Sequence, residues 1–410
     1  MNAEYRSLPP KFDLFKLAGD SNPYRGYSEL RAAGPLLRAG PGLWAVPRYS
    51  EVAALLRDPR LGPFRFHETL DPSRFMPDRA VKAESAANSF LDGLMVVADG
   101  PDHARLRKVV APALLQRLTP QLKTHVALMT DGLLDGFADA RMMEVVSELA
   151  YPVPLMVLSH LLGIPGNLQD TIGREVLKLS KLFSSIVSPA DRAEADLAVM
   201  FLRDCLGPLF DRRFESPADD LISDLTLAMR SGLLSRSEAI DNAIFLTFAG
   251  LETSISLIST GCVALANHQE QMARLRINPA CVPTAIDEFL RFDAPTQITA
   301  RTVQTPFELA GRRLSKGRVL LLLLGSANHD ERQFSSPEQL DVERHPNPHL
   351  SFGAGAHYCL GAALAKLESE VIFARLAQRF SAFELAGEVV REPCATPRIY
   401  SKIPIGVRAA

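Results

Sequence analysis

Apolar residues recur every three to four positions through most of residues 120–235, the spacing that lines one face of an α-helix. The breaks in this pattern coincide with proline-containing sequences near 163–165, 188–189 and 216–217. Two short apolar runs, at 43–46 and 319–324, are typical of buried strands. The second run is too short to cross a membrane. We therefore expect a mainly α-helical protein with small β-sheets.

The longest uninterrupted helical pattern covers residues 235–267, which contain no proline. Ser235 and Glu238 form a capping-box pattern at its start, and at 1.5 Å per residue the helix extends roughly 48 Å. Inside it, Glu252 and Thr253 interrupt an apolar stretch. Two readings stay open here. The threonine hydroxyl could bond to a backbone carbonyl in a kinked helix, or the two residues could be an acid–alcohol pair with a chemical role.

Two predictions concern the N-terminal quarter of the chain. Ser50 is positioned to cap a short helix that ends at Asp58-Pro59. Residues 62–98 are rich in Phe, Met, Arg and Pro without clear periodicity, which predicts an irregular connection. Long connections of this kind usually carry function or move.

Three glycines, a histidine and a cysteine lie within Ser351–Lys366, which reads S-F-G-A-G-A-H-Y-C-L-G-A-A-L-A-K. Gly353 and Gly355 suit a tight turn that brings Cys359 to the start of the following helix. Helix N-termini carry free N–H groups and partial positive charge, which favour the thiolate form that binds metals. Most lone cysteines are buried structural thiols, so the cysteine taken alone only weakly indicates a metal ligand.

Composition narrows the class of protein. The chain has 410 residues and a net charge of −2, which gives no reason to expect nucleic-acid or membrane binding. Its five cysteines are scattered and form no C-x-x-C pair, which argues against a disulfide framework or a zinc site and fits a reducing cytosol. The N-terminal residues lack an apolar core, so we expect neither a signal peptide nor an anchor.

The cysteine segment, Phe352-Gly353-x-Gly355-x-His357-x-Cys359-x-Gly361, resembles the haem-binding loop of the cytochrome P-450 family. Three further motifs occur in the family's order: H-x-x-x-R at 103–107, A-G-L-E-T-S at 249–254 and E-x-x-R at 288–291. The resemblance implies a cytochrome P-450 fold, with one haem-binding domain over residues 1–410 and a short tail at about 1–20. In this family the cysteine is the axial thiolate of the haem iron.

The resemblance also assigns roles to residues. Glu252 and Thr253 are the implied catalytic pair, which relays protons to dioxygen. Glu288, Arg291 and Arg344 are the implied structural network behind the haem. The implied haem contacts are Cys359 as the iron ligand, together with His103, Arg107, Arg301, His357, Phe352, Gly353, Ala249 and Gly361. The implied substrate contacts are Phe90, Leu91, Leu94, Phe245, Thr296, Gln297, Ile298, Ile399 and Tyr400.

The implied reaction is the insertion of one atom of dioxygen into an apolar organic substrate. Hydroxylation or epoxidation of a specialised metabolite such as a polyketide or terpenoid is expected. Haem b is the implied cofactor and dioxygen the co-substrate. The scattered cysteines cannot hold an iron–sulfur cluster, and the resemblance implies that electrons from NAD(P)H arrive through a separate ferredoxin reductase and ferredoxin. The protein is expected to be a cytoplasmic monomer.

Two alternatives stay open. One is a peroxide-driven or non-oxygenating haem-thiolate enzyme that performs dehydration or ring coupling. The other is a haem-binding sensor without turnover. The Glu252–Thr253 pair favours the monooxygenase, because peroxide-driven members of the family usually lack it. The sequence does not identify the substrate.

Overall fold

The computed structural model describes residues 13, 17, 19–64, 85–137, 141–183, 188–394 and 397–410. The α-helices are α2 (Tyr24–Ala33), α3 (Tyr49–Leu55), α5 (Ala86–Asp92), α6 (Gly100–Leu115), α7 (Pro120–Asp135), α8 (Pro152–Leu162), α9 (Gly166–Leu177), α10 (Pro189–Glu215), α11 (Leu221–Arg230), α12 (Arg236–Asn267), α13 (Gln269–Ile277), α14 (Val282–Phe292), α15 (Leu324–Ala327) and α16 (Ala362–Arg379). Shorter 3₁₀ or π turns are η3 (Val146–Ala150), η4 (Lys178–Phe183), η5 (Pro279–Cys281) and η6 (Gly355–His357).

The strands are short and scattered along the chain. They are β1 (Leu37–Gly40), β2 (Leu43–Val46), β3 (Leu61–Pro63), β4 (Met142–Glu144), β5 (Ile298–Val303), β6 (Phe307–Leu309), β7 (Arg312–Leu314), β8 (Val319–Leu323), β9 (Phe380–Leu385), β10 (Val390–Arg391), β11 (Tyr400–Lys402) and β12 (Pro404–Ala409). The predicted mainly helical fold with small sheets is confirmed, including the two buried strands β2 and β8.

The chain divides into two compact units. Unit 1 contains Met1–Gly62, Lys123–Val153 and Thr253–Ala410, and unit 2 contains Pro63–Leu122 and Pro154–Glu252. The division falls within α12, between Glu252 and Thr253. The expectation of one haem-binding domain over the whole chain stays a prediction.

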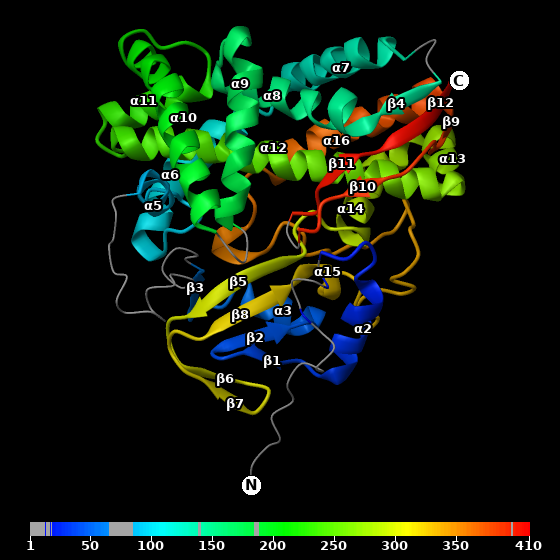
Figure 1. Cartoon of the computed structure of the whole chain (residues 1–410), viewed down its shortest axis with the longest axis horizontal. Coiled ribbons are helices and arrows are strands. Elements are labelled where there is room, and N and C mark those ends of the chain that lie inside the picture. The colour runs from blue at the N-terminus through cyan, green and yellow to red at the C-terminus, as the bar shows by residue number, and fades with distance from the viewer. Residues whose placement is uncertain are drawn as a thin grey trace. The chain divides into compact units, whose positions relative to one another are not determined.

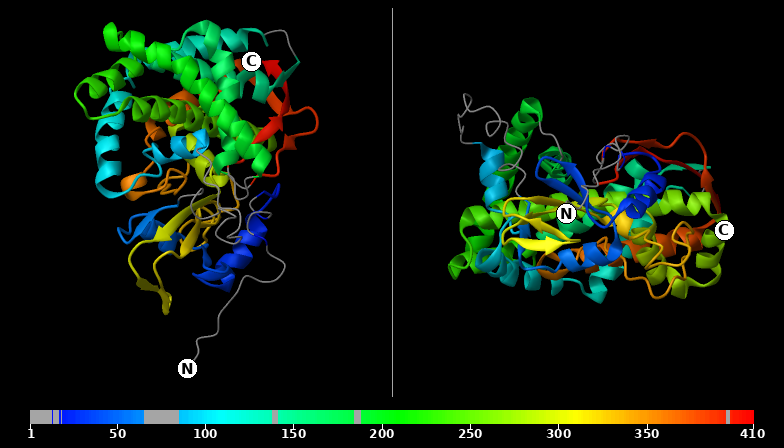
Figure 2. Two further views of the ribbon diagram at one scale, coloured as in Figure 1. Left: turned by 60° about the vertical axis from the view of Figure 1, so that its left-hand side comes forward. Right: turned by 90° about the horizontal axis from the view of Figure 1, so that it is seen from below.

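The main sheet of unit 1 has the strand order β1-β2-β8-β5-β3. β2 pairs with β8 in parallel and β5 pairs with β8 antiparallel, so β8 is its central strand. The strands β1, β2, β5 and β8 lie side by side in every view (Figure 1, Figure 2). Every residue of β8 is buried, as expected for a central strand that is covered on both faces.

The cap of α3 differs from the prediction. The N-cap residue is Arg48, whose side chain makes no capping bond, and the Ser50 hydroxyl donates to Glu51. The Tyr49 N–H instead donates to Asp330 Oδ2 at 2.9 Å. The prediction that Ser50 caps this helix is therefore wrong, because a carboxylate from a distant part of the chain occupies its N-terminus.

Within unit 2, the start of α12 matches its predicted capping box. The Glu238 N–H donates to Ser235 Oγ at 3.1 Å, and the Ser235 N–H donates to Glu238 Oε2 at 2.8 Å. Arg105 of α6 also pairs with Glu238, at 2.6 Å. By length and composition α12 could cross a membrane. However, 67% of its most apolar 18-residue segment is buried in the protein, as in the core helix of a soluble protein.

The expectation of an irregular connection over 62–98 is wrong for part of that stretch. Ala86–Asp92 forms α5, whose N-cap residue Ser85 accepts a hydrogen bond from the Asn88 N–H. Asn242 of α12 holds the end of this segment, because its side-chain oxygen accepts from the Met95 N–H at 3.0 Å. Residues 65–84 lie outside the described part of the chain.

Candidate functional site

The loop that carries Cys359 is shaped by its glycines. Gly353 and Gly355 have φ angles of +67° and +73°, which side-chain-bearing residues rarely adopt. A Cβ on Gly355 would also lie 2.7 Å from the carbonyl oxygen of Leu56. The loop closes when the Cys359 N–H donates to the Phe352 carbonyl at 2.9 Å. This turn leaves Cys359 exposed in unit 1.

The helix after this loop starts later than predicted. α16 begins at Ala362 with Gly361 as its N-cap, so Cys359 lies in the turn before the helix. The prediction that the cysteine starts the helix is wrong by about one turn, because the Cys359 N–H is used inside the loop. Gly361 has an ordinary φ of −82°, and a Cβ placed on it would meet nothing within 4 Å. Open space therefore lies over the backbone beside the cysteine.

Aromatic and charged side chains hold the two ends of the cysteine segment in place. The Phe352 ring lies 5.7 Å from the His349 ring and 6.2 Å from the Tyr358 ring, between centroids. His349 Nε2 is 3.3 Å from Asp287 Oδ1, and Lys366 Nζ is 2.5 Å from the same oxygen. Burial acts to raise the pKa of Asp287, but the hydrogen bonds from His349 and Lys366, together with the Lys366 charge, hold this pKa below its ordinary value. Asp287 thus connects α14 to both ends of the cysteine segment.

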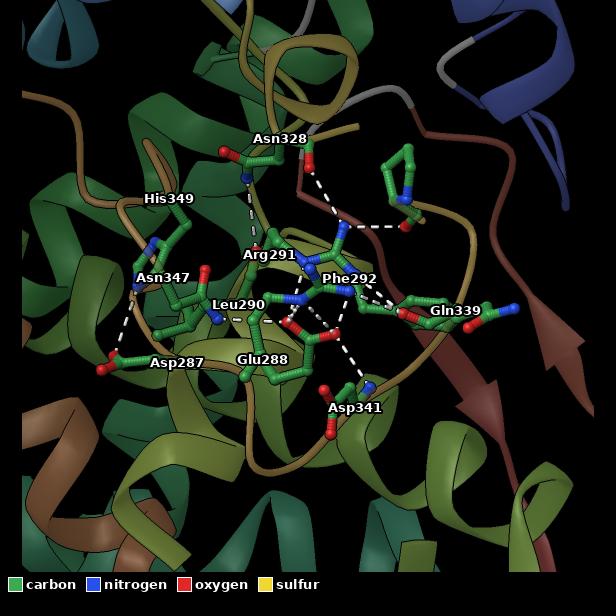
Figure 3. Close-up of polar contacts among 12 residues, drawn as sticks. Asp287, Glu288, Leu290, Arg291, Phe292, Asn328, Gln339, Asp341, Asn347 and His349 are labelled. Carbon is green, nitrogen blue, oxygen red and sulfur yellow. Dashed lines mark hydrogen bonds and ion pairs between the residues drawn. The ribbon is translucent and has the colours of Figure 1, made fainter. Parts of the chain in front are cut away.

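The structure brings Glu288, Arg291 and Arg344 together. Figure 3 shows the contact between Glu288 and Arg291. Glu288 and Arg291 have no exposed surface, and their side chains are paired at 2.7 and 2.8 Å. The Arg344 Nε lies 3.1 Å from Glu288 Oε2. Both oxygens of the carboxylate therefore accept hydrogen bonds from guanidinium groups, as a buried charge requires.

Sequence reasoning missed several members of this network. Asn347 Nδ2 and the Asp341 N–H donate to Glu288 at 3.1 and 3.0 Å. The Asn328 carbonyl accepts from Arg291 at 3.1 Å (Figure 3). The Asn328 side chain accepts from the Leu350 N–H at 2.8 Å and donates to Ser351 Oγ at 2.8 Å, so it ties the network to the start of the cysteine segment. Asn328 lies in the sequence A-N-H-D at residues 327–330, and this sequence was the feature from which its role could have been predicted.

The remaining predicted cofactor residues of unit 1 are Arg301 and His357. Arg301 lies on β5, half-buried, and its guanidinium donates to the Ala300 carbonyl at 2.9 Å and to Thr299 Oγ1 at 3.3 Å. His357 ends the short turn η6 and is also half-buried. Phe352, Gly353, Gly361 and Cys359 belong to this unit as well.

Unit 2 contains His103, Arg107, Ala249 and Glu252. His103 and Arg107 lie one turn apart on α6, with His103 buried and Arg107 half-buried. Burial, reinforced by the Arg107 charge, lowers the pKa of His103 from 6.5, so the ring is neutral near pH 7. Ala249 is half-buried on α12, three residues before Glu252.

Glu252 is a buried acid with an altered pKa. Its side chain is 7% exposed, and burial raises its pKa from 4.5 to about 7, although a hydrogen bond from Ser180 opposes the shift. Such a carboxyl can hold or release a proton near neutral pH. Thr253, the next residue, is half-buried and belongs to unit 1.

The predicted substrate contacts fall into two groups. Phe245, Thr296 and Ile399 keep exposed surface. The buried ones are Phe90, Leu91, Leu94, Gln297, Ile298 and Tyr400. Gln297 donates to the Ala294 carbonyl at 2.8 Å, and a Cβ on Gly325 would lie 1.9 Å from its Oε1, so its side chain fills space inside unit 1.

Among the described residues, no group of three or more His, Cys, Asp or Glu side chains could hold a metal ion.

The chain matches known proteins over most of its length. The family model described as Cytochrome P450 matches residues 281–402. The Biotin biosynthesis cytochrome P450 of Bacillus subtilis is 33% identical over 369 residues, covering 89% of this chain and 91% of the relative. The 6-deoxyerythronolide B hydroxylase of Saccharopolyspora erythraea is 34% identical, covering 88% and 89%.

A solved structure shows the same fold. The crystal structure of P450BioI in complex with hexadec-9Z-enoic acid ligated Acyl Carrier Protein matches with a TM-score of 0.87 and 31% identity, covering 94% of this chain and 99% of that chain. The cysteine loop and the E-x-x-R network both lie within the matched family region. From these similarities, the chain belongs to the cytochrome P450 family of haem-thiolate monooxygenases.

Proposed function

We propose that the chain uses haem b to insert one atom of dioxygen into an apolar organic substrate, by hydroxylation or epoxidation. The observation that carries the proposal is the loop at Gly353–Cys359, whose two left-handed glycines leave an exposed thiol next to the open space at Gly361. The remaining roles rest on family membership and on the local surroundings of each residue.

The residues around Cys359 fit a haem. An exposed thiol can reach an iron atom, and the missing side chain at Gly361 leaves room for a flat ring above the backbone. Cys359 would hold the haem iron through its sulfur, and the bound haem would supply the activation of dioxygen, because a thiolate donates electron density to the iron. Phe352, held between His349 and Tyr358, would shield the sulfur from one side.

Haem carries two propionates, which need hydrogen-bond donors. In unit 1, Arg301 and His357 would supply them, and the bonds that Arg301 makes to β5 already restrict its side chain. In unit 2, His103 and Arg107 would do so from one face of α6. A neutral His103 still donates one N–H, while Arg107 brings the positive charge.

Glu252 and Thr253 would handle protons. A carboxyl with a pKa of about 7 is close to the ideal for proton transfer at neutral pH, since it is neither fully charged nor a very weak acid. The Thr253 hydroxyl can both accept and donate a hydrogen bond, so it can pass the proton onward. Ala249, one turn before Thr253, would leave space for a small ligand.

The relatives and the composition support a proposal for the substrate and the partners. The named relatives act in biotin biosynthesis and on 6-deoxyerythronolide B, which supports a specialised metabolite of mainly apolar character. Phe245, Thr296 and Ile399 would contact it. NAD(P)H, a ferredoxin reductase and a ferredoxin would deliver electrons to a cytoplasmic monomer.

The test is the absorption spectrum of the reduced carbon monoxide complex. The purified holoprotein should show the red-shifted Soret band typical of thiolate ligation, and Cys359→Ala should lose it. Cys205→Ala, a change of the same kind on α10, is the control and should retain the band. A thiolate band that persists in Cys359→Ala would remove the ligand assignment and the proposed function with it.

A further inference from the structure

The β10–β11 hairpin carries an arginine, Arg391, with two buried side-chain nitrogen atoms that lack hydrogen-bond partners. Arg391 lies opposite Tyr400 across this hairpin. Its Nε and Nη1 atoms are buried, and neither has a hydrogen-bond partner. A guanidinium group is always charged in proteins, so its buried N–H groups need acceptors. Burial, with repulsion from Arg398, lowers the pKa of Arg391, but the group stays cationic.

The neighbouring arginine shows the contrast. Arg398 is 2% exposed, and its Nη atoms donate to the carbonyls of Asp20 and Ser21 at 3.0 and 3.1 Å. Its Nε lies 2.7 Å from Asp293 Oδ1. The protein thus holds Arg398 through its Nη atoms and its ion pair with Asp293, although its Nε makes no hydrogen bond of normal geometry. Neither Nε nor Nη1 of Arg391 has a hydrogen-bond partner.

The nearby carboxylate cannot balance both cations. Asp293 pairs with Arg398 and accepts the Tyr24 hydroxyl at 2.5 Å, so its charge is already matched. Asp20, the other acid that interacts with Arg391, is exposed and therefore screened by solvent. The cluster of Arg391, Arg398 and Asp293 keeps one net positive charge.

A second unused donor lies in the same cluster. Tyr27 on α2 has no exposed surface, and its hydroxyl has no hydrogen-bond partner. The Tyr27 ring lies 6.1 Å from the Tyr24 ring, between centroids, and the Tyr24 hydroxyl donates to Asp293, so Tyr27 lies beside this cluster. A buried hydroxyl without a partner is unfavourable, because it loses its hydrogen bonds to water and gains none in the protein. Two independent side chains therefore lack an acceptor here.

We propose that Arg391 and the Tyr27 hydroxyl bind the carboxylate of an otherwise apolar substrate. A carboxylate offers two acceptor oxygens and a single negative charge, which matches the single surplus positive charge of the cluster. A phosphate monoester carries nearly two charges and would exceed it. Ordered water could bond the N–H groups but would leave the charge unbalanced. This inference rests on the proposed function, because it names the class of substrate.

The test compares acids with their esters. Saturated fatty acids of about eight to sixteen carbons, and the methyl ester of each, are titrated into the holoprotein and followed by the haem spin-state change and by equilibrium dialysis. The wild-type protein should prefer at least one acid over its ester by roughly tenfold or more, since hydrogen bonds to charged groups contribute about 1.5–3 kcal/mol. Equal affinity for every acid and its ester overturns the proposal.

Matched variants assign the preference to the site. Arg391→Gln should abolish the preference for the acid, Arg391→Lys should retain part of it, and Tyr27→Phe should reduce it by a smaller factor. Arg25→Gln removes the same charge from an arginine whose side chain is 94% exposed on α2, and it should change nothing. An acid preference that survives in Arg391→Gln overturns the assignment. The carbon monoxide spectrum of each variant reports folding and thiolate ligation separately, so the proposed function and this inference can fail independently.

Discussion

Two buried carboxyl groups dominate the electrostatics at the scale of single residues. Burial raises the pKa of Glu252 to about 7 and that of Glu368, on α16, to about 8. Each has a serine beside it that opposes the shift, Ser180 for Glu252 and Ser254 for Glu368. The Ser254 hydroxyl lowers the pKa of Glu368. Neither Glu368 oxygen, however, has a hydrogen-bond partner of normal geometry. Neither acid is fully ionised at neutral pH.

Glu252→Gln should lower the rate of product formation by roughly a hundredfold, because proton transfer by a positioned side chain contributes about that much. It should also remove the inflection near pH 7 from the pH profile of turnover. Product per pair of electrons, measured with redox partners across this pH range, gives both values. Ser180→Ala is the matched control, since it should move the inflection to higher pH without removing it. An unchanged profile in Glu252→Gln would exclude the acid from the relay.

Glu368 makes a separate prediction about stability. Its folded-state pKa of about 8 is above the ordinary 4.5, so the folded chain keeps a proton that the unfolded chain has released between these pH values. The free energy of unfolding should therefore be greatest at low pH in this window, fall as pH rises and level off above about 8. Each pKa unit corresponds to about 1.4 kcal/mol.

Glu368→Gln should flatten this dependence, as measured by urea unfolding at a series of pH values. Glu252→Gln should remove only the contribution of Glu252, which lies below about pH 7, so the decline caused by Glu368 should persist up to about pH 8 in that variant. A wild-type protein whose stability rises through this window would contradict the assigned state of Glu368.

At the scale of elements, the cysteine loop allows a graded test. Gly355→Ala combines a φ of +73° with a Cβ 2.7 Å from the Leu56 carbonyl, whereas Gly353→Ala has a φ of +67° and no contact closer than 3.8 Å. We expect Gly353→Ala to destabilise the apoprotein by about 1–2 kcal/mol and Gly355→Ala by more. Gly361→Ala, with open space around it, should leave apoprotein stability unchanged but lower haem content.

Urea unfolding of the apoproteins, together with haem-to-protein ratios, measures this order. Equal losses at Gly353 and Gly355 would show that the close approach to Leu56 does not matter. Full haem occupancy in Gly361→Ala would argue against a flat cofactor above that residue.

The elements also show where sequence reasoning succeeds and where it fails. Ser235 and Glu238 cap α12 as predicted because a capping box is complete within four residues. The cap of α3 was predicted wrongly because Asp330 supplies it from a part of the chain that no local pattern connects to Tyr49. The start of α16 was placed too early because the Cys359 N–H bonds back to Phe352.

At the scale of the whole molecule, the buried Glu288 network is the feature most sensitive to substitution. Glu288→Gln would replace a carboxylate that faces Arg291 and Arg344 with an amide whose N–H groups oppose theirs. Breaking a buried ion pair in this way costs about 3–5 kcal/mol. Urea unfolding should show this loss.

An exposed ion pair is the control for this change. Arg236 and Asp211 are paired at 2.9 Å with more than half of each side chain exposed, so Asp211→Asn should cost less than about 1 kcal/mol. Similar losses in the two variants would show that burial of the network does not determine its contribution.

Three members of this network were predicted from the sequence, two from their spacing and one from the family resemblance. The other members were missed for a physical reason. Glu288 and Arg291 are one helical turn apart, so their pairing can be read from spacing. Arg344 was found only through the family resemblance. Asn347 and the Asp341 N–H reach Glu288 from irregular chain, whose path depends on the packing of the whole unit.

The order of segments along the chain has a consequence for biosynthesis. β2 is made early, yet its parallel partner β8 emerges from the ribosome only after the whole of unit 2 has been synthesised. Until then, one edge of β2 has no partner in the native sheet. Unpaired strand edges promote association between chains. Nascent chains that terminate before Val319 should therefore be prone to aggregation, and the final assembly of unit 1 can occur only late in translation.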